Sequence, residues 1–263
     1  MIMNDSVNYE IHGEVVLITL DRPKANAIDV KTSYELGEAF IRFRYDYNLR
    51  AAVITGAGDR FFCGGWDLKA ASEGEEIDAD FGPGGFAGLT ELWNLNKPVI
   101  AAVNGLAVGG GFELALAADL IIASSSAEFF VPEATLGLIP DSGGVLRLPR
   151  RLPKVVAMDM LMTGRRMGVE EAKHYGLVNM SCDQDALINQ ALEWAHRISS
   201  SAPLSLAAIK SVIRSTEMMG LEEAYELMRS GKIEAYHKML NSDDAKEGPI
   251  AFSEKRSPKW KGQ

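Results

Sequence analysis

A long run of mostly apolar residues, 99–118, constrains the fold of this chain more than any other segment. The run approaches the length of a membrane-spanning helix. However, Asn104 and Glu113 interrupt it, and glycines at 105 and 109–111 would leave a single helix poorly determined. A buried strand, a glycine loop and a buried helix account for the same residues, so we expect this run to form protein core.

Short apolar runs alternate with helical spacing along the first half of the chain. Apolar residues at 36, 40 and 43 predict a helix over 33–44. Strands separated by helices indicate an α/β fold with a mainly parallel sheet. Residues 70–88, rich in Gly, Glu and Asp, are expected to form a mobile excursion over a site. The runs expected as buried strands are 15–20, 51–55, 99–103 and 120–123.

Amphipathic helices dominate the second half. We expect an α/β core over residues 1–200 and a helical C-terminal region over 201–263, which could pack on its own sheet or on a neighbouring subunit. The Glu-Gly-Pro sequence at 247–249 is expected to end the last helix before a basic tail. The helices predicted here are 186–198, 203–213 and 221–240.

Charge and cysteine content exclude several classes of protein. The chain has 36 acidic and 27 basic side chains and a net charge of −9, which disfavours binding to nucleic acid or anionic membranes. Cys63 and Cys182 lie far apart, and the histidines lack ligand spacing, so we expect neither a disulfide scaffold nor a metal site. Residues 1–10 lack a secretion signal. A cytoplasmic location is therefore the expectation.

A dinucleotide-binding turn is a competing interpretation of residues 55–58, where a strand runs into Thr-Gly-Ala-Gly. Phe61 stands where that motif requires a third glycine, and no Tyr-x-x-x-Lys pair is present. Both features argue against nicotinamide chemistry and favour a plain turn at a strand end.

The glycines at 109–111 lead directly into a predicted helix that carries Glu113 in its first turn. Free N–H groups at such a helix start can stabilise an oxygen that becomes negative during a reaction. The alternative is that the glycines admit close packing and that Glu113 interacts with the helix dipole. This segment alone does not decide between the two.

Two further loops add a second donor and a second carboxylate. Gly64 and Gly65 precede another helix start, and Glu133 follows Pro132 at a third. Taken singly, Glu133 fits a solvent-facing acid of a first helical turn. Two carboxylates that converge on two backbone donors favour a catalytic site instead.

These motifs together resemble the crotonase (enoyl-CoA hydratase/isomerase) superfamily. Gly-Trp-Asp-Leu-Lys at 65–69, Gly-Gly-Gly-Phe-Glu at 109–113 and Pro-Glu at 132–133 follow its pattern in order, and the likeness covers nearly the whole chain. The resemblance implies a crotonase-like spiral of ββα units with a helical C-terminal trimerisation region, as a homotrimer or a dimer of trimers. It implies no metal or cofactor, because coenzyme A is part of the acyl-CoA substrate, and water is the other reactant.

Segments 20–29, 65–71 and 80–91 are similar to the branch of the superfamily that interconverts crotonobetainyl-CoA and carnitinyl-CoA. The expected activity is therefore that reversible hydration, by a hydro-lyase. A general short-chain enoyl-CoA hydratase or an enoyl-CoA isomerase is the alternative, and a non-catalytic CoA- or RNA-binding relative is a more distant one.

The resemblance also assigns roles by position. The backbone N–H groups of Trp66 and Gly110 would form the oxyanion hole, and Glu113 and Glu133 would be the acid/base pair. In hydration Glu113 would take a proton from water while Glu133 protonates the α-carbon. The residues expected to contact CoA or substrate are Lys24, Ala25, Ala27, Gly64, Asp67, Leu68, Lys69, Phe86 and Asp141.

Some of these contacts have plainer explanations. The lysines could be ordinary solvated side chains, and Asp67 fits a helix cap. Aromatic faces and a nearby acid could hold a trimethylammonium group, although the same aromatics could simply pack the excursion onto the core. The candidates for that pocket are Trp66, Phe81, Phe86, Trp93 and Asp141. Many superfamily members have a small residue where Trp66 stands, so generic fatty-acyl specificity is not assumed.

Overall fold

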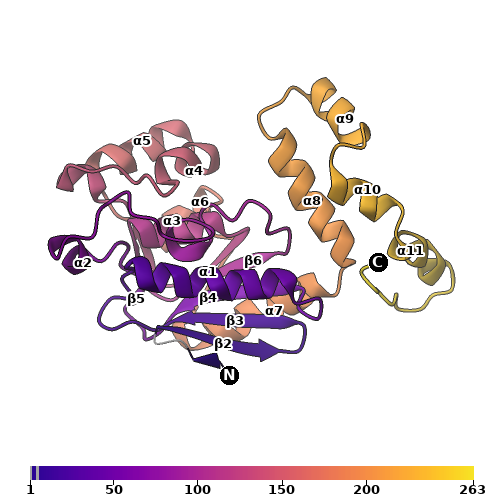
Figure 1. The fold of residues 1–263 in the computed structure, drawn as a ribbon, viewed down its shortest axis with the longest axis horizontal. Helices are drawn as coiled ribbons and strands as arrows, with labels where there is room; N and C mark the ends of the chain where they lie inside the picture. The colour runs from indigo at the N-terminus through magenta and orange to yellow at the C-terminus, as the bar shows by residue number, and fades with distance from the viewer. Residues whose placement is uncertain (1, 4–5) are drawn as a thin grey trace.

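The computed structural model describes residues 2–3 and 6–263, and a seven-stranded sheet forms its centre (Figure 1). The strand order is β1-β2-β3-β4-β6-β8-β11. The first three strands are antiparallel neighbours, and every pairing from β3 to β11 is parallel, as the alternation of strands and helices predicted. The strands are β1 (Ile2–Met3), β2 (Val7–His12), β3 (Val15–Leu20), β4 (Ala51–Gly56), β6 (Val99–Val103), β8 (Leu120–Ser124) and β11 (Met180–Cys182).

A second sheet of four short strands carries the loops of the candidate site. Its order is β10-β9-β7-β5, with β5 (Phe61–Cys63) and β9 (Glu128–Phe130) parallel to β7 (Leu106–Val108), and β10 (Met167–Gly168) antiparallel to β9. The sequence did not predict this sheet, because runs of two or three residues are too short to show an alternating pattern.

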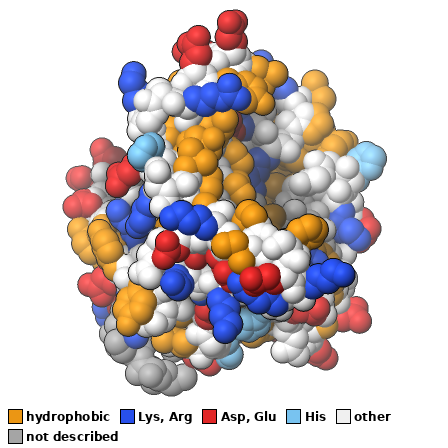
Figure 2. Space-filling view, turned by 90° about the vertical axis from the view of Figure 1, so that its right-hand side faces the viewer, with side chains coloured by type: hydrophobic (Ala, Val, Ile, Leu, Met, Phe, Trp, Pro, Cys, Tyr) orange, Lys and Arg blue, Asp and Glu red, His pale blue; other side chains and the backbone are white. Residues whose placement is uncertain are grey.

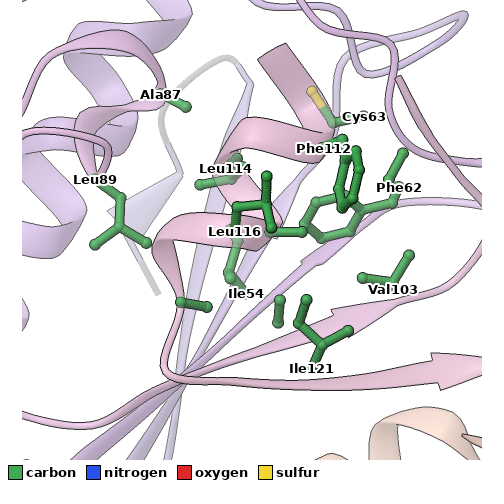
Figure 3. Packing of buried hydrophobic residues seen from close by; sticks show 14 of the residues in the cluster. Ile54, Phe62, Cys63, Ala87, Leu89, Val103, Phe112, Leu114, Leu116 and Ile121 are labelled. Atoms are coloured by element: carbon green, nitrogen blue, oxygen red, sulfur yellow. The ribbon is translucent and has the colours of Figure 1, made fainter. Parts of the chain in front are cut away.

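Helices cover both faces of the large sheet. Alternate residues of β3, β4 and β6 face α1 (Val30–Tyr45) and α3 (Gly110–Ala117), while the others face α7 (Leu187–Ser199). In Figure 3 the α3 side chains Phe112, Leu114 and Leu116 lie over Ile54 and Val103 of the sheet. The remaining helices of the α/β part are α2 (Leu68–Ser72), α4 (Gly144–Arg151), α5 (Lys154–Thr163), α6 (Val169–His174) and the 3-10 turns η1 (Phe86–Gly88), η2 (Glu133–Leu136) and η3 (Gln184–Ala186).

The run 99–118 is core, as expected. It forms β6, β7 and the start and body of α3, all largely buried. Among the described residues, no helix is both long and apolar enough to cross a membrane.

Four C-terminal helices extend to one side of the α/β part (Figure 1). They are α8 (Pro203–Thr216), α9 (Leu221–Arg229), α10 (Glu234–Leu240) and α11 (Asp243–Ser253). The prediction of one helix over 221–240 was wrong, because the chain turns at Gly231, whose φ of 80° is the left-handed conformation that glycine accepts.

The predicted helix end at 247–249 was also wrong, because α11 continues through Pro249. A proline inside a helix removes one backbone hydrogen bond. A local cap and contacts with the C-terminal tail offset that loss. Ser242 caps the helix by accepting the N–H of Ala245, and the Asp244 carboxylate accepts the N–H groups of Lys261 and Gly262, so the C-terminal tail anchors α11.

Candidate active site

The loop after β5 presents one backbone N–H to a cavity. The N–H of Ile28 donates to Gly65 O (2.8 Å), and the N–H of Asp67 donates to Ile28 O (2.9 Å). Because successive residues of an extended chain face opposite ways, this pairing turns the N–H of Trp66 away from Ile28. A side chain on Gly65 would crowd Val108 O and the nitrogen of Gly110, so glycine lets the two loops meet.

The start of α3 presents a second N–H to the same cavity. The first bond of that helix runs from the N–H of Glu113 to Gly109 O (2.9 Å), and Gly110 is the first helical residue. The N–H of Gly110 therefore has no carbonyl acceptor within the helix. Trp66 and Gly110 both line the cavity, as the two donors of an oxyanion hole would.

The empty space of this cavity, including the part that is open to solvent, is about 690 Å³. Its wall is mostly apolar, with three carboxylates set into it. The lining residues are Gly64, Gly65, Trp66, Leu68, Ile77, Phe81, Phe86, Val108, Gly109, Gly110, Glu113, Pro132, Glu133, Leu136, Leu138, Ile139, Asp141 and Ser142.

Glu113 is almost completely buried, with 2% of its surface exposed. Its Oε1 accepts the N–H of Gly144 at 2.6 Å. Burial raises the pKa of Glu113 to about 8, the Gly144 hydrogen bond opposes that rise, and the nearby charges of Glu133 and Asp141 add to it. The side chain is thus a carboxylic acid near neutral pH.

Glu133 is the first residue of η2 and also lines the cavity. Its Oε1 lies so close to Gly109 that a methyl group there would overlap it. Its Oε2 is buried and has no hydrogen-bond partner among the described residues, as expected of an oxygen kept for a substrate. Burial raises the pKa of Glu133 to about 6, its own backbone N–H opposes the rise, and the charge of Asp141 adds to it.

Only some of the predicted substrate contacts line this cavity, namely Gly64, Leu68, Phe86 and Asp141, together with Trp66, Gly110 and both glutamates. The other predicted residues do not: Lys24, Ala25, Ala27, Asp67 and Lys69 lie outside it. Their contacts with CoA stay predictions.

The residues outside the cavity have structural partners of their own. Asp67 caps α2 by accepting the N–H of Lys69 (2.9 Å) and pairs with Arg22 (2.7 Å). Ala25 O accepts the N–H of Gly64 (2.8 Å), which fixes the loop that leads to Trp66. Trp93, a candidate for the trimethylammonium pocket, is 58% exposed and lines a separate hollow beside α8.

Sequence reasoning missed several wall residues, including Ile77, Leu136 and Ile139. It marked 70–88 as an excursion over a site, but no local pattern shows which of its side chains face inward. It also missed Glu75, whose Oε1 accepts the indole N–H of Trp66 at 2.7 Å.

Comparison with known proteins decides the family. The sequence profile of the enoyl-CoA hydratase/isomerase family matches residues 10–263. The chain belongs to this family. Its solved members include an enoyl-CoA hydratase from Mycobacterium tuberculosis H37Rv, 37% identical with a TM-score of 0.90, covering 99% of this chain and 100% of that one. An enoyl-CoA hydratase from Bacillus anthracis is 34% identical with a TM-score of 0.89, covering 98% and 100%.

Relatives within the enoyl-CoA hydratase/isomerase family are much closer in sequence. Carnitinyl-CoA dehydratase of Proteus mirabilis (strain HI4320) is 61% identical over 261 residues, which cover 99% of this chain and 100% of the relative. Carnitinyl-CoA dehydratase of Escherichia coli (strain K12) is 59% identical over the same length and coverage. These likenesses confirm the superfamily and the crotonase-like fold expected from the sequence motifs.

Proposed function

We propose that this hydro-lyase catalyses the reversible hydration of crotonobetainyl-CoA to carnitinyl-CoA. The observation that carries the proposal is the convergence of Glu113 and Glu133 on one cavity with the backbone N–H groups of Trp66 and Gly110. The carnitinyl-CoA dehydratases, about three-fifths identical over their full length, support the choice of acyl group.

The oxyanion hole makes the addition of water feasible. When water adds to the β-carbon of a conjugated thioester, negative charge develops on the thioester oxygen. The two N–H groups would hold that oxygen, and each such donor contributes about 3–4 kcal/mol to lowering a barrier of this kind. Addition of water to a double bond is not a net oxidation or reduction, so the proposed reaction needs no redox cofactor, and CoA arrives as part of the substrate.

Burial raises the pKa values of both glutamates, to about 8 for Glu113 and about 6 for Glu133, which favours a single proton on the pair at pH 7, carried by Glu113. This is the starting state for dehydration: Glu133 takes the α-proton while Glu113 protonates the departing hydroxyl. Hydration runs in reverse, from the state in which the single shared proton sits on Glu133. One proton on the pair therefore serves both directions.

The walls of the cavity suit a cationic acyl group. The rings of Phe81 and Phe86 meet edge to face, with centroids 5.2 Å apart, and Asp141 also lines the cavity. An adjoining hollow shares these residues and adds Asp78, Asp80 and Glu91. In the part of the chain that the structure describes, no lysine or arginine lines either space. Aromatic faces together with these acids favour a trimethylammonium group.

The test is a comparison of kcat/KM for crotonobetainyl-CoA and crotonyl-CoA, followed through the absorbance of the conjugated thioester. A preference for the betaine above about a hundredfold, or roughly 2.7 kcal/mol, supports the proposal. A reversed or absent preference would identify a general enoyl-CoA hydratase. No turnover of either would favour isomerisation or another acyl group.

A matched pair of variants sharpens that test. Phe81→Leu removes a ring from the cavity and should lower the preference for the betaine. Phe61→Leu makes the same change in a ring that stacks on Arg60 outside the cavity, and should leave the preference unchanged.

We also propose assembly as a homotrimer or a dimer of trimers in the cytoplasm, where the two free thiols, Cys63 and Cys182, would stay reduced. Figure 2 shows hydrophobic side chains gathered in an upright band beside a hollow on the face that carries the C-terminal helices. Such an apolar surface favours burial against another subunit. The large exposed apolar residues of α8–α11 include Ile209, Ile213, Leu221, Tyr225, Leu240, Ile250 and Phe252. Light scattering on the purified protein would give the subunit number, and a monomer would overturn this assembly.

A further inference from the structure

One carboxylate, that of Glu75, ties the cavity wall to the start of α1. Its Oε1 accepts the indole N–H of Trp66 at 2.7 Å, and its Oε2 accepts the backbone N–H of Val30 at 3.0 Å. Val30 is the first residue of α1, where a backbone N–H lacks an intrahelical acceptor and negative charge is favoured. An ionised acceptor makes both bonds stronger than neutral ones.

Glu75 belongs to the excursion that covers the cavity. It follows Gly74, whose φ is 106°, and its own N–H donates to Ala70 O at 3.0 Å. Two residues further on, Ile77 lines the cavity that Trp66 also lines. Glu75 therefore fixes the position of the Trp66 indole relative to the excursion.

The main chain of Trp66 is held by a different contact. The pairing with Ile28 fixes the residues on both sides of it, Gly65 and Asp67, and does not involve Glu75. Loss of the Glu75 contact would therefore free the indole while the backbone N–H of Trp66 keeps its place. The effect of Glu75 falls on the shape of the acyl cavity and not on the oxyanion hole.

We propose that Glu75 is a positioning residue that fixes the Trp66 indole as a wall of the acyl cavity and so sets the preference for a bulky cationic acyl group. The inference rests on the proposed function, because it assigns the selectivity of that same site. A crotonyl group ends in a methyl group, so its binding depends on contact with the Trp66 indole much less than the binding of a trimethylammonium group does.

The first test is Glu75→Gln, which keeps the shape of the side chain but turns one acceptor oxygen into an N–H donor that faces another donor. KM for crotonobetainyl-CoA should rise about tenfold, with kcat changed less than about threefold and the constants for crotonyl-CoA nearly unchanged. Glu76→Gln, the same change at the neighbouring exposed glutamate outside the cavity, is the matched control and should behave as wild type. An equal loss with both thioesters, or an equal loss in the control, would overturn the proposal.

A double-mutant cycle separates positioning from a general structural role. Trp66→Phe keeps an aromatic ring but has no N–H for Glu75 to accept. In that background Glu75→Gln should lose most of its effect on KM. If Glu75 merely stabilised the excursion, its effect would be the same in both backgrounds, and the proposal would be wrong.

The failure of this inference can be told apart from the failure of the proposed function. A wild-type preference for crotonyl-CoA would refute the betaine substrate by itself. The cycle is then read from calorimetric dissociation constants of whichever thioester binds, and additive effects there would still overturn the role of Glu75.

Discussion

Replacing Gly109 by alanine should damage catalysis far more than folding. Gly109 has φ 51° and ψ −122°, a conformation that only glycine adopts readily, and it precedes the helix start that carries Gly110. An added methyl group would also overlap Glu133 Oε1. The substitution therefore strains the backbone and displaces one member of the acid/base pair.

The two effects have separable magnitudes. Backbone strain of this kind costs about 1–3 kcal/mol, which corresponds to a fall in Tm of roughly 2–12 °C for a chain of this length. To restore an ordinary contact, the Glu133 carboxylate must move by about 1 Å, and a misplacement of that size can lower kcat about a hundredfold.

The assay is steady-state turnover at a temperature where circular dichroism shows the variant to be folded. Gly176→Ala is the matched control, since Gly176 has φ 74° but no neighbouring atom within 4 Å of the added methyl group. The control should lose Tm without losing kcat. A Gly109→Ala variant with wild-type kcat would refute the placement of Glu133 beside Gly109.

Three further predictions concern protons. Because one shared proton serves both directions, kcat/KM for crotonyl-CoA should rise through pH about 6 and fall through about 8. Asp141→Asn should move both limbs to lower pH, since the charge of Asp141 raises both pKa values; unmoved limbs would contradict that coupling. In the folded protein Glu113 keeps its proton up to a pH of about 8, whereas in the unfolded chain it releases that proton above pH 4.5. The free energy of unfolding therefore falls as the pH rises from 4.5 toward about 8. The Glu113→Gln variant does not titrate at this position, so the amount by which its Tm exceeds the wild-type Tm should grow as the pH rises through this range. Thermal melts that show a constant Tm difference would contradict this prediction.

Much of the large sheet was predictable because its strands are short apolar runs that end at turn residues. The expected strands at 15–20 and 99–103 match β3 and β6 residue for residue. The four-stranded sheet was not predictable, because its strands of two or three residues are too short to show an alternating pattern. The path of α11 through Pro249 was missed because contacts with the distant C-terminal tail outweigh the local cost of the proline.

The site was predictable where the chemistry is local. Glycines before a helix and an acid in its first turn made this segment a candidate, although the roles of Gly110 and Glu113 came from the resemblance to the family and not from the segment alone. The pairing of Ile28 with Trp66, which aims the second N–H, joins segments far apart in the chain and leaves no local pattern. The bond between Glu75 and the Trp66 indole is hidden in the same way within a segment whose sequence indicates only a loop.

Turnover by the Glu113→Gln and Glu133→Gln variants is the decisive test of the two-glutamate mechanism. Each substitution is expected to lower kcat for crotonobetainyl-CoA about 10²–10⁴-fold, because each removes one proton-transfer group. Thioester binding, measured by calorimetry, should stay within about threefold of wild type, because the oxyanion donors are backbone groups that neither change removes. Turnover retained in both single variants would contradict the two-glutamate mechanism.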